Sequence, residues 1–291
     1  MKHILTIALC LTAFITTACA KEEVEETIEQ TLDFKSGQLL KVSGLNGSIV
    51  IKTGRDDQIE MVVIKKAKAN TEQEAEELLE NTYIEIEPTA KGLEISTKHP
   101  EQGMLRRGRS IQVKYILTVP QIVILDLHTT NGNIEITETE GDIGAKTSNG
   151  KIHINGAQGD IKTKTSNGKI HVGNVTGNVN AKSTNGSIRL AEIQGGITAS
   201  TTNGSLRIDV VEPSNEPIQA QTTNGGIDIT LPSDYQAHLE AKTTNGRIST
   251  DFPITVKGRF SGKSISGALN GGGDTRIRLQ TTNGSIDIDH R

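Results

Sequence analysis

Apolar residues in this chain recur at fixed distances from a short polar signature. The tetrapeptide Thr/Ser-Thr/Ser-Asn-Gly occurs eight times, with its asparagine at Asn131, Asn149, Asn167, Asn185, Asn203, Asn224, Asn245 and Asn283. The first four intervals between these asparagines are 18 residues, the next two are 21 and the last is 38. Short, nearly constant periods are typical of stacked coils rather than of a domain with one central core.

Apolar columns emerge when the coils are aligned on these asparagines. Side chains along a strand alternate between its two faces, so positions two residues apart share a face. The third position after each asparagine is always Ile or Leu, from Ile134 to Ile286. The sixth position before it is Leu, Ile or Val, from Leu125 to Ile277, and the fourth before it is mostly Ala. Each coil is therefore predicted to contain two short strands around a thin interior.

The repeated columns also indicate how the strands pair. An isolated Asn-Gly pair usually signals an antiparallel hairpin. Identical columns at a fixed period favour instead a parallel pairing of each strand with its equivalent in the next coil, roughly 4.8 Å away. The pattern predicts an all-β fold, a parallel β-solenoid of two-strand coils of about 18 residues over residues 125–291.

The region before the repeats, residues 20–124, is expected to be rich in β-strands but less regular. Its Glu-rich start, Lys21–Glu29, is interpreted as a solvated tether that leads into a strand around Thr27–Phe34. The segment Asn46–Ile51 has the residue pattern of a coil. Because about 85 residues separate it from the next asparagine of the series, we expect it to stand apart from the main stack.

One short helix is predicted in this N-terminal region, over Asn70–Asn81. Asn70 or Thr71 is a suitable N-cap, a glutamate follows three residues later, and apolar residues share one face, namely Ala75, Leu78 and Leu79. We expect this helix to cover one end of the stack, since an uncovered solenoid end promotes aggregation.

The longest interval between repeats is interpreted as a closing turn. It contains Phe252, Phe260 and the Gly-rich segment Gly267–Gly273. We expect this irregular segment to close the C-terminal end of the stack before the final coil, which runs through Ile288.

Residues 1–19 have the features of an export signal. An apolar run, Ile4–Ile15, follows a basic start and is too short for a stable transmembrane helix. Ala18-Cys19-Ala20 fits cleavage by ordinary signal peptidase, whereas Thr16–Cys19 resembles a bacterial lipobox in which Cys19 becomes the lipidated first residue. We favour Cys19 as a lipid attachment site, which makes the membrane a predicted partner. No cysteine follows Cys19, so no disulfide is expected in the mature chain.

The lysines of the central coils form the candidate binding site. Lys146, Lys164 and Lys182 occupy the same outward position in three successive coils and are predicted to form a ladder, with Lys151 and Lys169 in the same basic segment. The net charge of the whole chain is −4, so the basic stripe is a local feature and no nucleic-acid partner is expected. The ladder indicates a polyanionic partner such as an acidic glycan or lipid head groups. Alternatively, the lysines only keep an exposed sheet soluble.

A threonine column two residues before each asparagine also has two interpretations. It runs from Thr129 to Thr281, with one serine at Ser183, and is similar to the threonine arrays of ice-binding solenoids. Its parity with Ile143 and Ala145 places it on the inward side. A buried ladder with satisfied hydroxyls is therefore favoured.

A histidine pair is the nearest approach to a metal site in the repeats. His153 and His171 are expected to stack on the outside, one coil apart. The matching positions of the neighbouring coils hold Glu135 and Arg189, which supply no evident third ligand. A solvated pair is favoured, and neither a metal ion nor a cofactor is expected.

Sequence signatures of catalysis are absent from the chain. It contains no Gly-x-Ser-x-Gly, no His-Glu-x-x-His and no phosphate-binding loop. The outward positions beside the corners carry no repeated Asp or Glu, which polysaccharide-cleaving β-helices require. The sequence therefore predicts a protein that is not an enzyme.

The predicted elements follow one another in a characteristic order. They are a signal peptide, the coil-like Asn46–Ile51, a Glu-rich helix, a strand ending at Leu117–Pro120, serial Thr-Thr-Asn-Gly-x-Ile coils and a Phe-Pro and Gly-rich turn before a last coil. This order resembles the bacterial putative-adhesin family of β-solenoid domains over roughly residues 28–290. The resemblance implies an envelope or surface location and a β-solenoid fold, and it implies no catalytic residues.

Together these features predict an exported, lipid-anchored, non-catalytic β-solenoid of the cell envelope or surface that binds an envelope or extracellular ligand. The alternative is a structural or envelope-stress component that acts through a protein partner. A binding protein should repeat its outward chemistry on one face, as the lysine ladder does. A partner-docking protein should expose apolar residues in a terminal cap, as Phe252 and Phe260 would.

Overall fold

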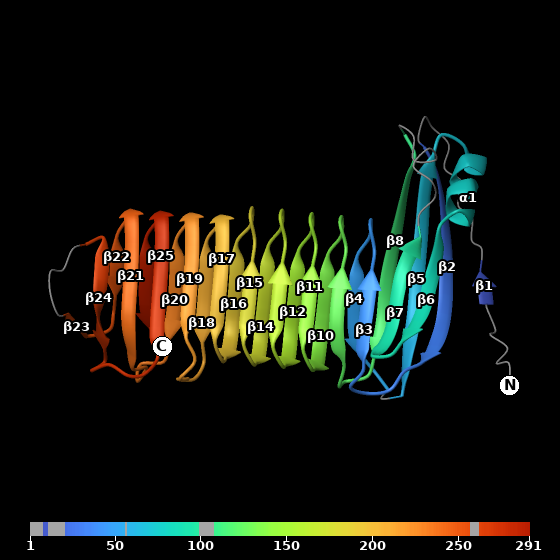
Figure 1. Cartoon of the computed structure of the whole chain (residues 1–291). Helices are drawn as coiled ribbons and strands as arrows, with labels where there is room; N and C mark the ends of the chain where they lie inside the picture. Colours follow the sequence, from blue (N-terminus) through green and yellow to red (C-terminus); the bar gives the residue numbers. More distant parts are fainter. Residues whose placement is uncertain (1–7, 11–20, 56, 99–107, 257–261) are drawn as a thin grey trace. The chain divides into compact units, whose positions relative to one another are not determined.

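The structure, a computed structural model, describes residues 8–10, 21–55, 57–98, 108–256 and 262–291 (Figure 1). The chain divides into two compact units, Met1–Thr139 and Glu140–Arg291. Strands make up most of both units, and one short helix belongs to the first. The predicted all-β class is confirmed.

The first unit contains two sheets. The β2 sheet has the strand order β2-β5-β8-β4-β10, and the β9 sheet has the order β9-β3-β7-β6. A short strand, β1 (Ala8–Cys10), pairs antiparallel with the outer edge of β2. The other strands are β2 (Glu22–Asp33), β3 (Leu39–Ser43), β4 (Ile49–Thr53), β5 (Gln58–Ala69), β6 (Tyr83–Thr89), β7 (Gly92–Lys98), β8 (Ser110–Val119), β9 (Ile124–His128) and β10 (Ile134–Glu140).

Strand β2 contains the Glu-rich segment, so its interpretation as a solvated tether was wrong. It pairs antiparallel with β5 along its whole length. Glu23 forms ion pairs with Lys66 and Lys68 of β5, both at 2.6 Å, and Glu26 pairs with the buried Lys65 at 2.7 Å. Opposite charges on adjacent strands compensate for the low strand propensity of Glu and Lys. This complementarity becomes visible only when β5 is placed beside β2.

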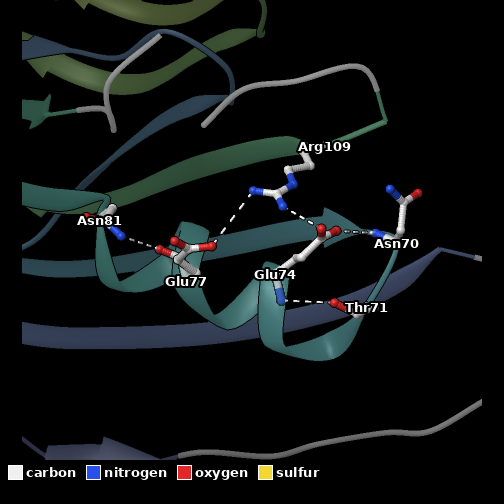
Figure 2. A network of polar contacts seen from close by, with 6 residues as sticks. All are labelled: Asn70, Thr71, Glu74, Glu77, Asn81 and Arg109. Carbon is white, nitrogen blue, oxygen red and sulfur yellow. Dashed lines mark hydrogen bonds and ion pairs between the residues drawn. The ribbon is translucent and has the colours of Figure 1, made fainter. Parts of the chain in front are cut away.

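Helix α1 (Glu72–Glu80) begins where the sequence predicted, at the N-cap Thr71. The hydroxyl of Thr71 accepts a hydrogen bond from the backbone N–H of Glu74, and the carboxylate of Glu74 accepts one from the backbone N–H of Asn70, each at 3.3 Å (Figure 2). Arg109 donates to the Glu74 carboxylate and lies 3.8 Å from that of Glu77. The hydrogen bond from Arg109 is the largest cause that lowers the pKa of Glu74.

The apolar face of α1 packs against β5 and β2. Ala75, Leu78 and Leu79 are buried, as the helical periodicity predicted. Lys65 closes the helix end, because its ammonium group donates to the carbonyl oxygens of Leu79 at 2.9 Å and Thr82 at 2.8 Å. A cation at this position also interacts favourably with the helix dipole. The helix therefore covers the outer strands of the β2 sheet.

The coil at Asn46 does not stand apart, contrary to the prediction. Strand β4 pairs in parallel with β10, with Ile49 opposite Ile134, and β3 pairs in parallel with β9. The side-chain amide of Asn131 donates to the side-chain oxygen of Asn46 at 2.7 Å. Two coils that are 85 residues apart in the sequence are thus direct neighbours in the fold.

The second unit is a stack of two-strand coils built from two sheets. The β12 sheet has the order β12-β14-β16-β18-β20-β26-β22, and the β11 sheet has the order β11-β13-β15-β17-β19-β25-β21-β24-β23. The strands are β11 (Ile143–Lys146), β12 (Ile152–Gln158), β13 (Ile161–Lys164), β14 (Ile170–Thr176), β15 (Val179–Lys182), β16 (Ile188–Gln194), β17 (Ile197–Asn203), β18 (Leu206–Val210), β19 (Ile218–Asn224), β20 (Ile227–Leu231), β21 (Ala237–Asn245), β22 (Ile248–Thr250), β23 (Ile254–Val256), β24 (Ser264–Leu269), β25 (Arg276–Asn283) and β26 (Ile286–His290).

The register of this stack follows the apolar columns. Ile170 of β14 lies opposite Ile152 of β12 and Ile188 of β16, and all three side chains are buried. The strands of successive coils are parallel. The predicted parallel pairing is confirmed, and each column forms a continuous line of buried β-branched and aliphatic residues.

The last coil of the chain is not the last coil of the stack. Strand β25 lies between β19 and β21, and β26 lies between β20 and β22. The expectation that this coil would follow the closing turn was therefore wrong in its order. Strands β24 and β23 do close the end, since they extend the β11 sheet beyond β21 as antiparallel neighbours.

The corner opposite the Asn-Gly turns requires glycine because successive coils approach closely there. Gly159 has a φ of 139°. A Cβ atom at this position would lie 2.5 Å from the carbonyl oxygen of Gly141 in the preceding coil. Only glycine avoids this clash and adopts such a φ without strain.

Candidate functional site

The predicted lysine ladder lies on the outward face of the β11 sheet. Lys146 of β11 is opposite Lys164 of β13, which is opposite Lys182 of β15. All three are exposed because the alternating side chains of the same strands, such as Ile143 and Ala145, are buried. Lys162 of β13 is also exposed on this face. It was not among the predicted site residues, although its parity is the same as that of Lys164.

These four lysines lack a carboxylate partner within the described part of the chain. Asp142 and Asp160 precede the strands of these lysines, but both carboxylates accept hydrogen bonds from the backbone of the next coil. The backbone N–H of Asp160 donates to Asp142, and that of Asn178 donates to Asp160, each at 3.0 Å. The acids nearest in sequence are thus engaged in hydrogen bonds between coils, and the lysine charges face solvent.

The structure places the other two predicted lysines on the opposite side of the Asn-Gly corner. Lys151 and Lys169 are exposed and immediately precede β12 and β14. Their parity directs them to the outward face of the β12 sheet. The five predicted lysines therefore belong to the same coils but to two different faces.

The corner between these faces carries a ladder of asparagine side chains. The amide of Asn167 donates to the side-chain oxygen of Asn149, and the amide of Asn185 donates to that of Asn167, both at 2.8 Å. Asn203 continues the ladder at 2.8 Å. The sequence pattern indicated how the strands at this corner pair but did not predict hydrogen bonds between the asparagine side chains. Their recurrence at a constant period was the signal for a side-chain ladder.

The threonine column is buried, as predicted. The hydroxyl of Thr165 donates to the carbonyl oxygen of Gly150 in the preceding coil at 3.1 Å, and that of Thr201 donates to Gly186 at 2.9 Å. Ser183 does the same with Gly168 at 3.1 Å. Because these hydroxyls point inward, the column offers no flat array for binding ice.

The two histidines meet on the outward face of the β12 sheet. The rings of His153 and His171 are T-shaped with centroids 4.9 Å apart, and the next residue in this register is Arg189. Partial burial, followed by the neighbouring charges of His153 and Arg189, lowers the pKa of His171. Among the described residues, no group of three or more His, Cys, Asp or Glu side chains is placed to hold a metal ion.

The far part of the same β12 face is acidic. Asp228 of β20 lies opposite Asp287 of β26, and Asp289 lies two residues further along β26. Partial burial is the largest cause that raises the pKa of Asp289, followed by the nearby carboxylates, of which Asp251 contributes most. This face therefore changes sign along the stack, from histidine and arginine to aspartate.

Two shallow hollows lie on the outward face of the β11 sheet, at the end away from the lysine ladder. They have volumes of about 170 Å³ and 340 Å³, and their polar lining includes Gln219, His238 and Arg276 in the first and Lys242, Ser264 and Gln280 in the second. Glu240 and Arg278 line both. The guanidinium group of Arg278 donates twice to one Glu240 oxygen, at 2.8 Å and 3.1 Å.

Of the two apolar residues that a docking cap would expose, Phe252 is buried in the structure. Phe252 is only 5% exposed, and its ring lies 5.9 Å from that of His290. The partner-docking alternative required Phe252 to be exposed, but the inserted last coil supplies a neighbour for its ring. Phe260 lies outside the described residues.

The proposed lipid anchor, Cys19, also lies outside the described residues. Within the part of the chain that the structure describes, no helix has the length and apolar character needed to cross a membrane.

Comparison with known proteins identifies a sequence family and matches among solved structures. The sequence profile described as Toastrack DUF4097 matches residues 40–289. A putative adhesin from Bacteroides fragilis NCTC 9343 has 12% identity and a TM-score of 0.47, with coverage of 90% of this chain and 97% of that chain. A putative lipid binding protein from Parabacteroides distasonis ATCC 8503 has 11% identity and a TM-score of 0.41, with coverage of 92% and 96%. No curated protein matches the chain.

Proposed function

Because the chain belongs to the Toastrack DUF4097 family, over residues 40–289, we propose that it is a non-catalytic protein of the cell envelope or surface that binds a polyanionic ligand on the outward face of its β11 sheet. Family membership agrees with the resemblance found in the sequence. We further propose that Cys19 carries a lipid that holds the protein at the membrane.

The lysine ladder is the observation that carries this proposal. Lys146, Lys164 and Lys182 are exposed and in register on adjacent strands, which places their ammonium groups at a repeat of about 4.8 Å. Like charges on adjacent strands repel one another unless they are solvated or matched by an opposite charge. A linear row of anionic groups supplies that match.

Several lysines of the first unit are arranged differently. In the first unit, Lys41 pairs with Glu94 at 2.8 Å and Lys98 pairs with Glu85 at 2.7 Å. Lys66 similarly pairs with Glu23. Cross-strand ion pairs are therefore common among the strand lysines of the first unit, although Lys52 and Lys114 form none there with the residues that the structure describes. The ladder departs from that arrangement, and this supports a ligand more than a role in solubility alone.

Acidic glycans, teichoic-type phosphates and lipid head groups share the required chemistry, a row of anionic oxygens. The rival function, docking of a protein partner through the closing turn, has less support because Phe252 is buried. A partner would have to use another surface.

The test compares wild type with the triple variant Lys146→Gln, Lys164→Gln, Lys182→Gln for retention on an acidic polysaccharide resin and on anionic liposomes. Retention of wild type should fall as the ionic strength rises, because the Debye length shrinks to about 8 Å at 0.15 M salt. The triple variant should be retained weakly even at low salt. A matched control with the same charge change, Lys35→Gln, Lys91→Gln, Lys114→Gln, alters exposed lysines elsewhere and should behave as wild type. Equal retention of the folded triple variant and wild type would refute the proposal.

A further inference from the structure

Two rows of outward side chains cross the β11 sheet at right angles to its strands. The first row contains Lys146, Lys164, Lys182, Ser200, Gln221, Gln280, Lys242 and Ser264. The second row contains Gly144, Lys162, Asn180, Thr198, Gln219, Arg278, Glu240 and Ser266. Both rows run without interruption from β11 to β24.

The rows have basic ends and a neutral centre. We call the four lysines of β11, β13 and β15 the near zone. The far zone consists of Lys242, which belongs to the first row, and Arg276, which lies beside the rows opposite His238. Arg276 lines the first hollow and Lys242 the second. Glu240 is the one acidic residue of the two rows, and Arg278 pairs with it at 2.8 Å. Short hydroxyl and amide side chains lie between the zones. The two rows therefore present an anion with attraction at both ends and hydrogen-bonding groups in between.

The insertion of the last coil completes the far zone. Arg276 and Arg278 belong to β25, and the register places Arg276 opposite His238 and Arg278 opposite Glu240 of β21. Without the inserted strand, β21 would lack these neighbours. The opposite face of the unit differs in sign at the same level, because β20 and β26 carry Asp228, Asp287 and Asp289 there. An anionic polymer is thus directed to one face of the stack.

We propose that this face binds a linear acidic glycan that lies across the strands and contacts both zones at once. The inference rests on the proposed function and specifies its ligand. Six strand spacings separate β11 from β21, which corresponds to a span of about 30 Å. Charged groups of the glycan face lysine and arginine at the two ends, and its hydroxyl groups hydrogen-bond to side chains such as Gln219, Gln221 and Thr198 in the centre.

A flat membrane surface fits this face less well than a glycan. Interfacial binding combines basic residues with apolar side chains that enter the lipid. The large apolar side chains that are exposed in the described part of the chain are Leu45, Tyr83, Ile122 and Ile124, and all belong to the first unit. The face of the β11 sheet instead offers amides, hydroxyls and the hollows, which suit a polar polymer with ring substituents.

The test measures binding of oligogalacturonides of two lengths to the whole mature protein by titration calorimetry at one low ionic strength. The long oligomer spans both zones and the trimer spans one. Linking two contacts raises the affinity through effective concentration, so wild type should bind the long oligomer at least about tenfold more tightly than the trimer, beyond the statistical gain from its extra units.

One variant removes the charges of the far zone, and a second serves as its control. The far-zone variant, Lys242→Gln with Arg276→Gln, should lose most of this length dependence while it still binds the trimer. A matched control with the same charge change on the β12 face, Arg189→Gln with Arg247→Gln, alters two exposed arginines and should keep it. Thermal unfolding verifies that all variants remain folded.

The outcomes distinguish this inference from the proposed function. An unchanged length dependence in the far-zone variant would overturn the two-zone inference, even if the triple lysine variant had lost its binding. If neither the far-zone variant nor the triple lysine variant changed the binding of the oligomers, the proposed function would be overturned as well. Binding of wild type to phosphatidylglycerol vesicles without binding to either oligomer would overturn the glycan assignment and leave a membrane ligand.

Discussion

The side-chain amide of Asn245 donates a hydrogen bond to the side-chain oxygen of Asn283 at 2.8 Å, and Asn283 donates in turn to Asn224 at 2.8 Å. The asparagine ladder therefore follows the order of the stack and not the order of the chain. The last coil of the chain, which contains Ile286, lies between the coils of Ile227 in β20 and Ile248 in β22. Strand β22 ends the β12 sheet.

The position of this coil predicts a difference between two equivalent isoleucines of the repeat. Ile286 is fully buried between two coils, whereas Ile248 is partly exposed on the outermost strand. Ile286→Ala should reduce the free energy of unfolding by about 2–5 kcal/mol, because it leaves a cavity in packed surroundings. Ile248→Ala should cost less, about 1 kcal/mol, because its site is open. Denaturant unfolding of the two variants gives both values. A larger loss for Ile248→Ala would mean that the coils stack in chain order.

The inward and outward assignment of the columns predicts opposite effects for two adjacent residues. Ile170→Asp places a carboxylate between Ile152 and Ile188 in the interior and should cost about 4 kcal/mol or more. Lys169→Asp changes an exposed side chain and should alter stability by no more than about 0.5 kcal/mol. Thermal and denaturant unfolding provide the comparison, and similar losses for the two variants would contradict the assigned parity.

The contact between Arg109 and Glu74 predicts a pH-dependent contribution to stability. Arg109 lowers the pKa of Glu74 in the folded state, so the folded protein favours the ionised carboxylate more than the unfolded chain does. The contribution is fully present above the unfolded pKa of about 4.3, and it is lost as the pH falls through the lower, folded pKa. Glu74→Gln should therefore lower the melting temperature at neutral pH, and this difference from wild type should shrink in acid.

The same helix provides a control for this effect. Glu76 is exposed on α1 and is not one of the residues in the network around Arg109 that Figure 2 labels. Glu76→Gln should leave the pH dependence of the melting temperature close to that of wild type. If the melting temperatures of Glu74→Gln and Glu76→Gln depended on pH in the same way, the contact between Arg109 and Glu74 would not contribute to stability.

The proposed lipid anchor predicts a change in membrane partition. Acyl chains on Cys19 would give the mature protein a membrane affinity that its polar surface lacks, so wild type should sediment with membranes and Cys19→Ser should be released. Cys10→Ser changes the other cysteine of the chain and should leave the partition unaltered. Release of wild type and Cys19→Ser to the same extent would argue for cleavage by ordinary signal peptidase.

Local features were predictable from the sequence because they depend on nearby residues. The alternation around Ile152 and Ile170 determined which side chains face inward, and therefore also that the lysines at Lys146 and Lys164 face outward. The cap at Thr71 depends on residues within one helical turn. The burial of the threonine column followed from the same parity.

The order in which coils stack was decided by the tertiary structure. Every coil carries the same Asn-Gly signature and the same apolar columns, so each can pair with any other in equivalent register, and the sequence contains no local signal that distinguishes them. The structure places the coil of Asn46 beside that of Asn131 and the coil of Asn283 between those of Asn224 and Asn245. Lys146, Lys164 and Lys182 of the near zone lie in consecutive coils and were predicted from the sequence, whereas Arg276 of the far zone lies near Lys242 only because β25 is inserted beside β21. Which distant coils become neighbours depends on how all the coils and the closing strands pack together. These long-range contacts form only in the folded protein, so local sequence patterns do not reveal them.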